Sequence, residues 1–375
     1  MNQYILYIER FSGMILYEIR WNMKRYRFKE IINTDSFIPA LTKGVKDVEV
    51  IIDELNMIPI NNVGVSFLDV MENKNVLGKL YYYLNNSRVS LAIKLFFLKD
   101  KLIFLNYPFL KGRIFDYIIQ KRLLKNNRLC LIVHDIYSLQ TDKIEKSTLE
   151  KEINIFNCAD RIIFHNETMI SFLINHGLKN KKCLSIDLFD YILDDDIFEK
   201  RNLERKVIFA GNIAKAPFLS RMCFMRNRDF VLELYGSNYD KNSITAEFIN
   251  YNGILDPIDI IHNLNGSFGL IWDGDSIDKC DGKFGEYLKY NNPFKLSMYI
   301  AAGIPIICWS KSATAIFVEK NNIGFCINSL EEISKIFENI NEKDYERIKL
   351  NVEKIGIKVR KGFFLRQALK RLYNL

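Results

Sequence analysis

The feature that most constrains the fold is a series of short, apolar, β-rich runs that recurs along the whole chain, with helical periodicity between the runs. Strands that are apolar on both faces belong in a parallel sheet that helices cover on each side. The pattern therefore predicts an α/β protein with parallel sheets. The predicted strands are residues 4–8, 62–67, 101–105, 128–133, 160–164 and 182–186 in the first half, and 206–210, 230–235, 268–272, 304–309 and 324–327 in the second.

The length of 375 residues suits two domains. We expect a first Rossmann-like domain over residues 1–190, a linker over 191–205, a second Rossmann-like domain over 206–358 and a C-terminal helix over 359–375. The linker contains the run Asp194-Asp195-Asp196 among mixed charges. Three adjacent carboxylates in a charged connector are typical of a solvated turn, and we assign them no function.

The predicted C-terminal helix combines basic residues with an apolar stripe. Such a helix can lie on a membrane surface, pair with another subunit or pack against the first domain. Packing within the protein or across a homo-oligomer is the simpler interpretation, and a peripheral membrane contact stays an alternative. The stripe consists of Phe363, Phe364, Leu365, Ala368, Leu369 and Leu372.

The composition narrows the class of partner and the compartment. The net charge of +8 is spread along the chain in small pieces, which suits anionic ligands or a membrane surface but not nucleic acid. The seven cysteines form no C-x-x-C pair, which argues against a disulfide framework and a zinc site. Neither a secretory signal nor a membrane-spanning apolar run is visible, so we expect a cytoplasmic protein that contacts at most the inner face of the membrane.

A candidate anion site follows the strand at residues 268–272, which ends in Asp273-Gly274-Asp275. Further on, Asn292 is a suitable N-cap and Pro293 suits the first position of a helix that stops at Gly303. Lys295 adds positive charge to the first turn of this helix, whose dipole already favours an anion such as a diphosphate. The competing interpretation is a capped helix with a solvated lysine.

Two more predicted strands deliver polar groups to the same rim of the second sheet. The strand at 206–210 ends in a glycine turn, with Gly211, Asn212 and then Lys215. The strand at 230–235 ends in Tyr235, whose ring could stack on a nucleobase or simply cap the sheet. Two lysines and a helix N-terminus on one rim favour phosphate binding, because open α/β sheets bind ligands at the carboxyl ends of their strands.

The chain also resembles a known group of proteins, a bacterial family of GT-B glycosyltransferases that includes glucosyltransferase 3 and β-1,6-galactofuranosyltransferases. The likeness is dense between residues 131 and 327. The motifs that carry it are His134-Asp135-Ile136, Asn157-Cys158-Ala159-Asp160, His165-Asn166, Leu188-Phe189-Asp190-Tyr191, Val207-Ile208-Phe209-Ala210-Gly211-Asn212, Leu234-Tyr235-Gly236, Trp272-Asp273-Gly274, Gly285-Glu286-Tyr287-Leu288-Lys289, Asn291-Asn292-Pro293-Phe294-Lys295 and Ala301-Ala302-Gly303-Ile304-Pro305.

The resemblance implies two facing Rossmann-like domains with an interdomain cleft. It further implies a hexosyltransferase that moves galactofuranose or glucose from a UDP-sugar to a hydroxyl group of a glycan, lipid-linked or glycoprotein acceptor in bacterial surface polysaccharide or glycoprotein synthesis. Carried over by position, Lys215 and Lys295 contact the donor phosphates and Tyr235 packs on the nucleotide. No cofactor and no metal ion is implied, with the UDP-sugar as co-substrate.

Two departures from the family pattern stand out. The family tends to have a glycine-rich loop and a helix after the first strand, whereas residues 9–14 here hold one glycine, so the role of this loop toward donor or acceptor is in doubt. The Glu-x7-Glu pair of many retaining GT-B enzymes is absent, which favours inversion.

Inversion needs a general base in the first domain, because the acceptor hydroxyl must lose its proton. Asp135, at the end of the strand at 128–133, is the first choice, with His134 orienting it or contacting the donor. The alternative is that the pair only hydrogen-bonds a loop. Asp273 is expected to order the loop over the donor or to contact the sugar rather than to bind a metal, and Asn166 after His165 is interpreted as a helix N-cap.

Two other functions compete with an active transferase. A non-catalytic GT-B-like subunit would bind a nucleotide sugar or glycan and regulate a partner transferase. A Rossmann oxidoreductase is disfavoured, because no Gly-x-Gly-x-x-Gly follows an early strand.

Overall fold

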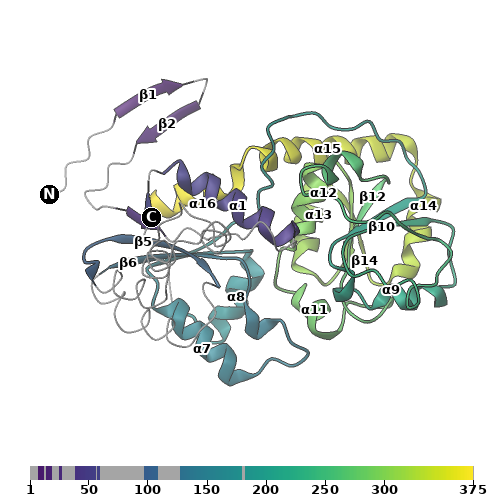
Figure 1. Cartoon of the computed structure of the whole chain (residues 1–375), viewed down its shortest axis with the longest axis horizontal. Helices are drawn as coiled ribbons and strands as arrows, with labels where there is room; N and C mark the ends of the chain where they lie inside the picture. The colour runs from purple at the N-terminus through teal and green to yellow at the C-terminus, as the bar shows by residue number, and fades with distance from the viewer. Residues whose placement is uncertain are drawn as a thin grey trace, which may run out of the picture.

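The computed structural model describes residues 7–11, 14–18, 25–27, 39–55, 57–59, 97–108, 127–179 and 182–374. Over these residues the chain forms two lobes, each around a six-stranded parallel sheet, and a separate two-stranded sheet (Figure 1). The predicted α/β class with parallel sheets is thus confirmed. The strand predicted at 62–67 lies outside the described residues.

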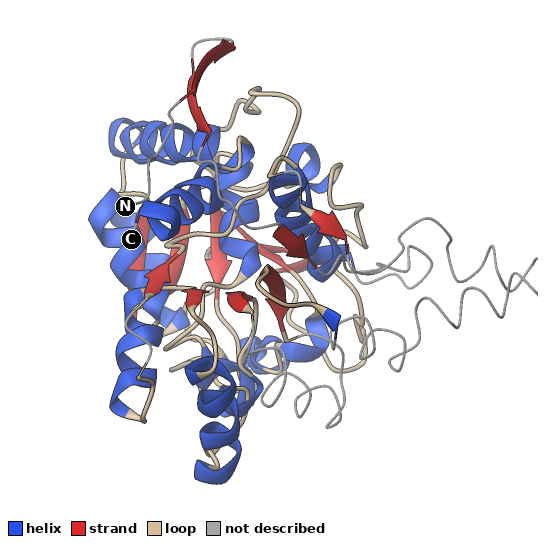
Figure 2. Cartoon of the chain, turned by 90° about the vertical axis from the view of Figure 1, so that its left-hand side faces the viewer, coloured by secondary structure: helices blue, strands red, loops and turns tan. Residues whose placement is uncertain are grey.

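The first sheet has the strand order β4-β3-β5-β6-β7-β8, and every neighbouring pair is parallel. Its strands lie between helices (Figure 2). Alternate residues of β5 face opposite sides: Leu102 and Phe104 pack with α1 and α16, while Ile103 and Leu105 pack with α7 and α8. The elements are β3 (Arg25–Arg27), α1 (Pro39–Asp53), β4 (Ile58–Pro59), β5 (Leu102–Tyr107), β6 (Arg128–Val133), α7 (Lys146–Asn157), β7 (Arg161–Phe164), α8 (Glu167–Asn175), β8 (Cys183–Ser185) and α16 (Phe363–Asn374).

The second sheet has the strand order β11-β10-β9-β12-β13-β14, so the order reverses between β9 and β12. Such a switch point is where ligands bind in doubly wound sheets. The strands are β9 (Lys206–Ala210), β10 (Val231–Tyr235), β11 (Ile249–Tyr251), β12 (Phe268–Ile271), β13 (Ile306–Trp309) and β14 (Gly324–Ile327). The helices are α9 (Phe218–Arg221), α10 (Ile260–Asn263), α11 (Gly282–Tyr287), α12 (Phe294–Ala301), α13 (Ala313–Asn321), α14 (Ile333–Asn339) and α15 (Glu342–Arg360).

The beginning of the chain differs from the expectation of a first strand at 4–8 and a loop at 9–14. Strands β1 (Tyr7–Phe11) and β2 (Met14–Glu18) form an antiparallel hairpin, in which Glu9 faces Leu16 and Phe11 faces Met14. Most of the supposed loop is therefore strand, because residues 14–18 offer a second β-rich run that pairs with the first.

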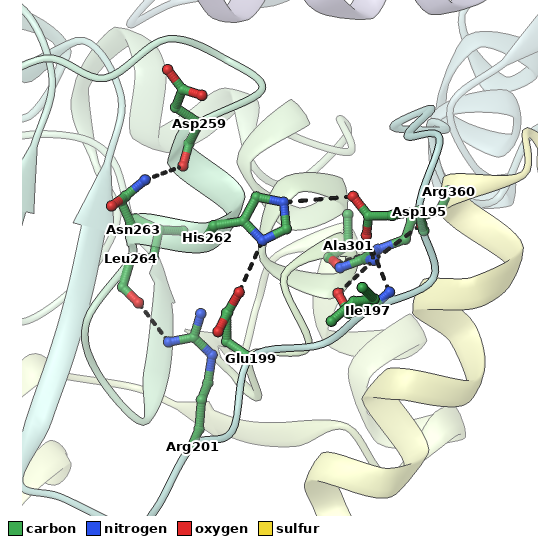
Figure 3. A network of polar contacts seen from close by, with 10 residues as sticks. All are labelled: Asp195, Ile197, Glu199, Arg201, Asp259, His262, Asn263, Leu264, Ala301 and Arg360. Carbon is green, nitrogen blue, oxygen red and sulfur yellow. Dashed lines mark hydrogen bonds and ion pairs between the residues drawn. The ribbon is translucent and has the colours of Figure 1, made fainter.

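The linker is held by specific ion pairs and is not merely a solvated turn. The guanidinium of Arg360, which is 1% exposed, donates hydrogen bonds to the carbonyl of Ala301 and to the Asp195 carboxylate (Figure 3). The ring of His262 lies between Asp195 and Glu199, with nitrogen to oxygen distances of 3.6 and 3.0 Å. A buried guanidinium requires such partners, which explains the acidic residues in this connector.

The last helix, α16, crosses from the second lobe back to the first (Figure 1). Its apolar residues Leu365, Ala368, Leu369 and Leu372 are buried against α1 and the first sheet. The two oxygens of Asp190 accept hydrogen bonds from the backbone N–H groups of Phe364 (3.1 Å) and Leu365 (2.8 Å) at the start of this helix. The chain's own first lobe therefore occupies these four residues, which leaves them unavailable to a membrane or a second subunit.

Candidate active site

Three polar residues come together at the switch point of the second sheet. Lys215 follows β9 in a short 3-10 turn, Asp273 follows β12, and Lys295 lies in the first turn of α12. Lys295 Nζ donates to Asp273 Oδ1 (2.7 Å) and to the carbonyl of Trp272 (3.2 Å). Burial raises the pKa of Asp273, and the nearby charges of Lys295 and Lys215 oppose that rise.

The two lysines differ in how firmly the protein holds them. Lys295 is paired with Asp273 and lies 4.4 Å from the ring centroid of Phe209, so its position is fixed before any ligand arrives. Lys215 is exposed, and its ammonium lies 4.9 Å from the ring centroid of Phe284. One carboxylate between two ammonium groups leaves one positive charge, which suits an anionic ligand.

The helix start differs from the expectation in one respect. Pro293 is the N-cap of α12, its backbone is extended, and the side chain of Asn292 does not cap the helix. Asn292 is 5% exposed and instead donates to the carbonyls of His165 and Asp187 in the first domain, both at 2.8 Å. Its role is to join the domains, because two strand-end carbonyls need a donor there. The end of α12 at Ala301, followed by Gly303 at φ +71°, agrees with the prediction.

Tyr235 does not present its ring for stacking. The residue is 4% exposed, and its hydroxyl accepts a hydrogen bond from the backbone N–H of Asn265 (3.1 Å). The assignment of Tyr235 as the nucleobase platform is therefore wrong, and the alternative that it caps the sheet holds. Its apolar ring is more stable in the core beside α10 than at the rim.

The glycine turn after β9 is shaped by a close approach of two backbones. Gly236, after β10, has φ +141°, and a Cβ atom there would lie 1.7 Å from the carbonyl oxygen of Gly211. Asn212 is exposed, and its side-chain oxygen accepts hydrogen bonds from the N–H of Ala214 (3.1 Å) and from Asn238 (2.9 Å). Gly211 and Asn212 thus shape the turn that presents Lys215.

Asp135 lies at the junction between the domains. Its Oδ1 accepts hydrogen bonds from Gln140 Nε2 (2.7 Å) and from the hydroxyl of Tyr287 (3.2 Å), which belongs to α11 of the second domain. Burial raises the pKa of Asp135 to about 6, against the opposing effects of Tyr287, Lys215 and Gln140. A carboxylate with this pKa is ionised at neutral pH and still basic enough to accept a proton.

The loop that carries Asp135 is held by hydrogen bonds to α7 of the first domain and to Tyr287 of the second. Glu152 of α7 accepts hydrogen bonds from the backbone N–H groups of Tyr137 (3.2 Å) and Ser138 (2.8 Å). The Tyr287 hydroxyl also accepts from the N–H of Ile136 (3.1 Å). Asp135 is therefore held by both domains at once.

His134 precedes Asp135 and is a neutral group. Its Nε2 lies 3.1 Å from Asn106 Oδ1, and its ring stacks on Phe189 with the centroids 5.8 Å apart. Burial lowers the pKa of His134 to about 4, so the imidazole carries no charge at neutral pH. It can accept or donate a hydrogen bond but does not attract an anion.

A second set of contacts joins the domains at the end of β7. Asn166 caps α8 by accepting from the N–H of Met169 (2.9 Å), as the sequence predicts. Its amide nitrogen also donates to the carbonyl of Tyr290 and to Asn292 Oδ1, both at 2.8 Å. The ring nitrogen Nδ1 of His165 accepts from the backbone N–H of Asn292 (3.0 Å).

Several residues of this region were not assigned from the sequence, among them Asn106, Gln140, Phe284 and Tyr287. Tyr287 belongs to one of the motifs that carry the family resemblance, and no other feature of the sequence indicated that it is a site residue. Asn106 lies in a strand that is otherwise apolar, and a lone amide in such a strand is itself a signal.

The arrangement sets a basic carboxylate on the first domain opposite two cations on the second. Lys215 is near enough to both Asp135 and Asp273 to affect their pKa values, so these groups share one region. A proton acceptor and a stabilised anion at one junction suit a displacement in which a hydroxyl attacks and a phosphate group leaves.

Comparison with known proteins places the chain among glycosyltransferases. The profile of the glucosyltransferase 3-like N-terminal domain matches residues 32–188, and that of the C-terminal domain matches residues 207–372. The chain is 34% identical over 282 residues to the β-1,6-galactofuranosyltransferase WbbI of Escherichia coli (strain K12), which covers 74% of this chain and 80% of the relative. It is 26% identical to glucosyltransferase 3 of Streptococcus gordonii, over 70% of this chain and 76% of the relative.

Two solved structures share the fold over nearly the whole chain. Anabaena Alr3699/HepE in complex with UDP-glucose matches with a TM-score of 0.56 and 12% identity, over 94% of this chain and 100% of that one. The lipopolysaccharide outer core galactosyltransferase WaaB matches with a TM-score of 0.56 and 10% identity, over 94% and 99% of the two chains.

Proposed function

This chain belongs to the glucosyltransferase 3-like family and has the GT-B fold, and from that premise we propose that it is an inverting transferase that moves a hexose from a UDP-sugar to a hydroxyl group of a glycan. The observation that carries the proposal is the meeting of Asp135 with the Lys215, Asp273 and Lys295 group at one interdomain junction. Galactofuranose and glucose are the candidate hexoses, since the relatives' names give both.

The proposed reaction is a single displacement. Asp135 removes the proton from the acceptor hydroxyl, whose oxygen forms a bond to the anomeric carbon while the bond to the diphosphate oxygen breaks. UDP leaves with the electron pair of that bond, and Lys215 and Lys295 stabilise its charge. Asp273 holds Lys295 in place at 2.7 Å. One attack on the anomeric carbon inverts its configuration.

We propose that the cations replace a metal ion and that no cofactor takes part. Asp273, the residue that a metal would recruit, is ion-paired with Lys295. Transfer activity should therefore persist in EDTA. Loss of activity in EDTA that manganese restores would show that an ion is required.

The central experiment incubates the protein with UDP-glucose, UDP-galactose and UDP-galactofuranose, with lipid-linked and protein-linked glycan acceptors, and follows UDP release. We expect one UDP-sugar to be consumed, and NMR of the product to show an inverted anomeric centre. Asp135→Asn should reduce transfer by 10²-fold or more, in the range for loss of a general base. Asp142→Asn, an exposed carboxylate in the same domain, is the matched control.

Two results would contradict the proposal. Retention of configuration would exclude the single displacement. Binding of a UDP-sugar without transfer to any acceptor would favour the non-catalytic subunit, whose role is to regulate a partner transferase.

We further propose a peripheral membrane contact through the outer face of α15. Among the described residues, no helix is long and apolar enough to cross a membrane. The outer face of α15 combines exposed apolar side chains, Leu350 (51%) and Ile357 (41%), with cations at helical spacing. The exposed cations on this face and just beyond its end are Lys343, Arg347, Lys354, Lys358 and Lys361. Such a stripe suits an anionic lipid surface, which would bring the enzyme to a lipid-linked acceptor.

Flotation with vesicles tests this contact. The protein should float with vesicles that contain phosphatidylglycerol and not with pure phosphatidylcholine, and Lys354→Glu with Lys358→Glu should abolish flotation. Lys241→Glu with Lys279→Glu makes the same charge change elsewhere on the second domain and should leave flotation intact. Equal loss in both double variants would show a nonspecific charge effect and remove the assignment to α15.

A further inference from the structure

A chain of three buried or half-buried side chains ends at His134. Glu49 on α1 and Asn106 on β5 are 6% and 4% exposed. The amide nitrogen of Asn106 donates to Glu49 Oε1 (3.1 Å), and its amide oxygen lies 3.1 Å from His134 Nε2. These hydrogen bonds join side chains and are not part of the β-sheet ladder. A buried network of polar side chains therefore needs a separate reason.

The hydrogen bonds from Glu49 through Asn106 determine the tautomer of His134. A carboxylate oxygen accepts hydrogen bonds, so the Asn106 amide turns its nitrogen toward Glu49 and its oxygen toward His134. An amide oxygen only accepts, so His134 Nε2 must carry the hydrogen. In the neutral imidazole the other nitrogen, Nδ1, then holds a free lone pair.

The Nδ1 atom of His134 is left open for a ligand. It has no hydrogen-bond partner among the described residues, and it is not one of the polar atoms that are enclosed without a partner. The stacked Phe189 ring, whose plane lies within 9° of the imidazole plane, fixes the orientation of the ring.

The neighbouring His165 shows the same tautomer in a different use. Its Nδ1 accepts from the backbone N–H of Asn292 (3.0 Å), so its hydrogen lies on Nε2, which is enclosed beside the backbone of Val133 and His134. The Nδ1 atom of His165 is thus used in a hydrogen bond between the domains, whereas the Nδ1 atom of His134 is free to accept one from a ligand.

We propose that Asn106, oriented by Glu49, is a positioning residue that fixes His134 as the Nε2–H tautomer, so that Nδ1 accepts a hydrogen bond from a hydroxyl group of the transferred sugar. The sugar contact rests on the proposed function, because the UDP-sugar supplies that hydroxyl. The tautomer is a property of the free protein, so it can be tested in the absence of any UDP-sugar.

The first test reads the tautomer directly by ¹⁵N NMR of the histidine rings. The chain has four histidines, and a His134→Gln sample identifies the signal of interest. The wild type should show a protonated Nε2 and an unprotonated Nδ1 between pH 5 and 8. Asn106→Leu should give a mixture of tautomers, and Glu49→Gln should shift the balance in the same direction if Asn106→Leu does not fold.

The Asn106→Asp variant provides a second measurement, the pKa of His134. A carboxylate next to Nε2 stabilises the imidazolium, so the pKa of His134 should rise from about 4 toward or above its ordinary value. The other titratable groups nearby are Glu49, His165 and the adjacent Asp135. Glu49 loses its amide donor in this variant and is expected to share a proton with the new carboxylate, whereas His165 and Asp135 are unchanged.

The second test separates positioning from simple damage to the fold. Asn106→Leu should lower kcat/KM for the UDP-sugar by 10-fold or more while the Kd for UDP, which lacks the transferred hexose, stays within about twofold. Asn127→Leu removes another buried amide of the first domain, one whose hydrogen bonds among the described residues go to the backbone of Leu98 and Lys101, and it should leave the His134 tautomer unchanged.

The outcomes are distinct from those of the proposed function. A wild-type protein with the proton on Nδ1, or an Asn106→Leu variant with an unchanged tautomer, overturns the inference. An equal loss of affinity for UDP and UDP-sugar also overturns it. If no UDP-sugar is used, the proposed function fails by itself, and the NMR measurement still decides whether Asn106 fixes His134.

Discussion

At the scale of single residues, the site works through charges that the protein has already placed. Lys295 is held by Asp273 and by the carbonyl of Trp272. Because the cost of fixing its side chain is met by the fold, little further entropy is lost when a diphosphate binds. Asp135 is poised in the same way, by hydrogen bonds from both domains.

Replacement of Lys295 should remove the better fixed of the two cations. We expect Lys295→Ala to lower kcat/KM by 10²-fold or more, since a charged hydrogen bond is lost and Asp273 is left buried without its partner. Steady-state kinetics and a circular dichroism spectrum check this. Lys311→Ala, an exposed lysine after β13, is the control, and near-normal turnover of Lys295→Ala would remove the diphosphate assignment.

The pH profile should report Asp135. Its pKa of about 6 predicts that kcat/KM falls as the pH drops below 6, where the base is protonated. The Tyr287 hydroxyl lowers this pKa by hydrogen bonding to the ionised carboxylate, so Tyr287→Phe should move the acid limb to higher pH. A limb that stays in place would show that another group acts as the base.

At the scale of elements, the domains meet both through loops and through helices, since Gly44 of α1 lies against the Phe294 ring of α12. The turn that carries Asn292 supplies donors to the strand-end carbonyls after β7 and β8. The helix α16 adds a second connection on the face of the first sheet that α1 covers. Both connections use backbone groups that would otherwise be buried without partners.

Stability should depend on pH through Asp190 at the start of α16. Burial raises its pKa to about 7, so the folded protein binds this proton more tightly than the unfolded chain. The stability that the protonated group contributes is full below pH 4 and is lost as the pH rises toward 7. Between pH 5 and 8 the loss should be about 2 kcal/mol, from two pKa units at about 1.4 kcal/mol each less an allowance for relaxation.

Urea unfolding at pH 5 and pH 8 measures this effect. Asp190→Asn should make the difference between the two pH values smaller, because the asparagine does not titrate. Asp142→Asn, an exposed carboxylate of the first domain, should leave the difference unchanged. If Asp190→Asn retains the full pH dependence, another group is responsible.

At the scale of the whole molecule, the two parallel sheets could be predicted because their strands are apolar runs. The strand β9 is found where the sequence predicts it, whereas β11 was missed because it has only 3 residues, of which Asn250 and Tyr251 are exposed. The charged residues of the site could be predicted from the sequence, whereas the contacts that each side chain makes could not. Asn292 has the local pattern of an N-cap, yet tertiary hydrogen bonds recruit it for the domain junction. Tyr235 ends a strand at the correct rim, but only the packing around it shows that the ring is buried.

The most direct measurement of the central claim is the thermal stability of the wild type and of Lys295→Ala with UDP and with NAD. The account predicts that millimolar UDP raises the melting temperature of the wild type, that NAD does not, and that Lys295→Ala loses most of the shift, because only a ligand that binds the folded state stabilises it. A wild type that does not respond to millimolar UDP would contradict the claim that this junction binds a UDP-sugar.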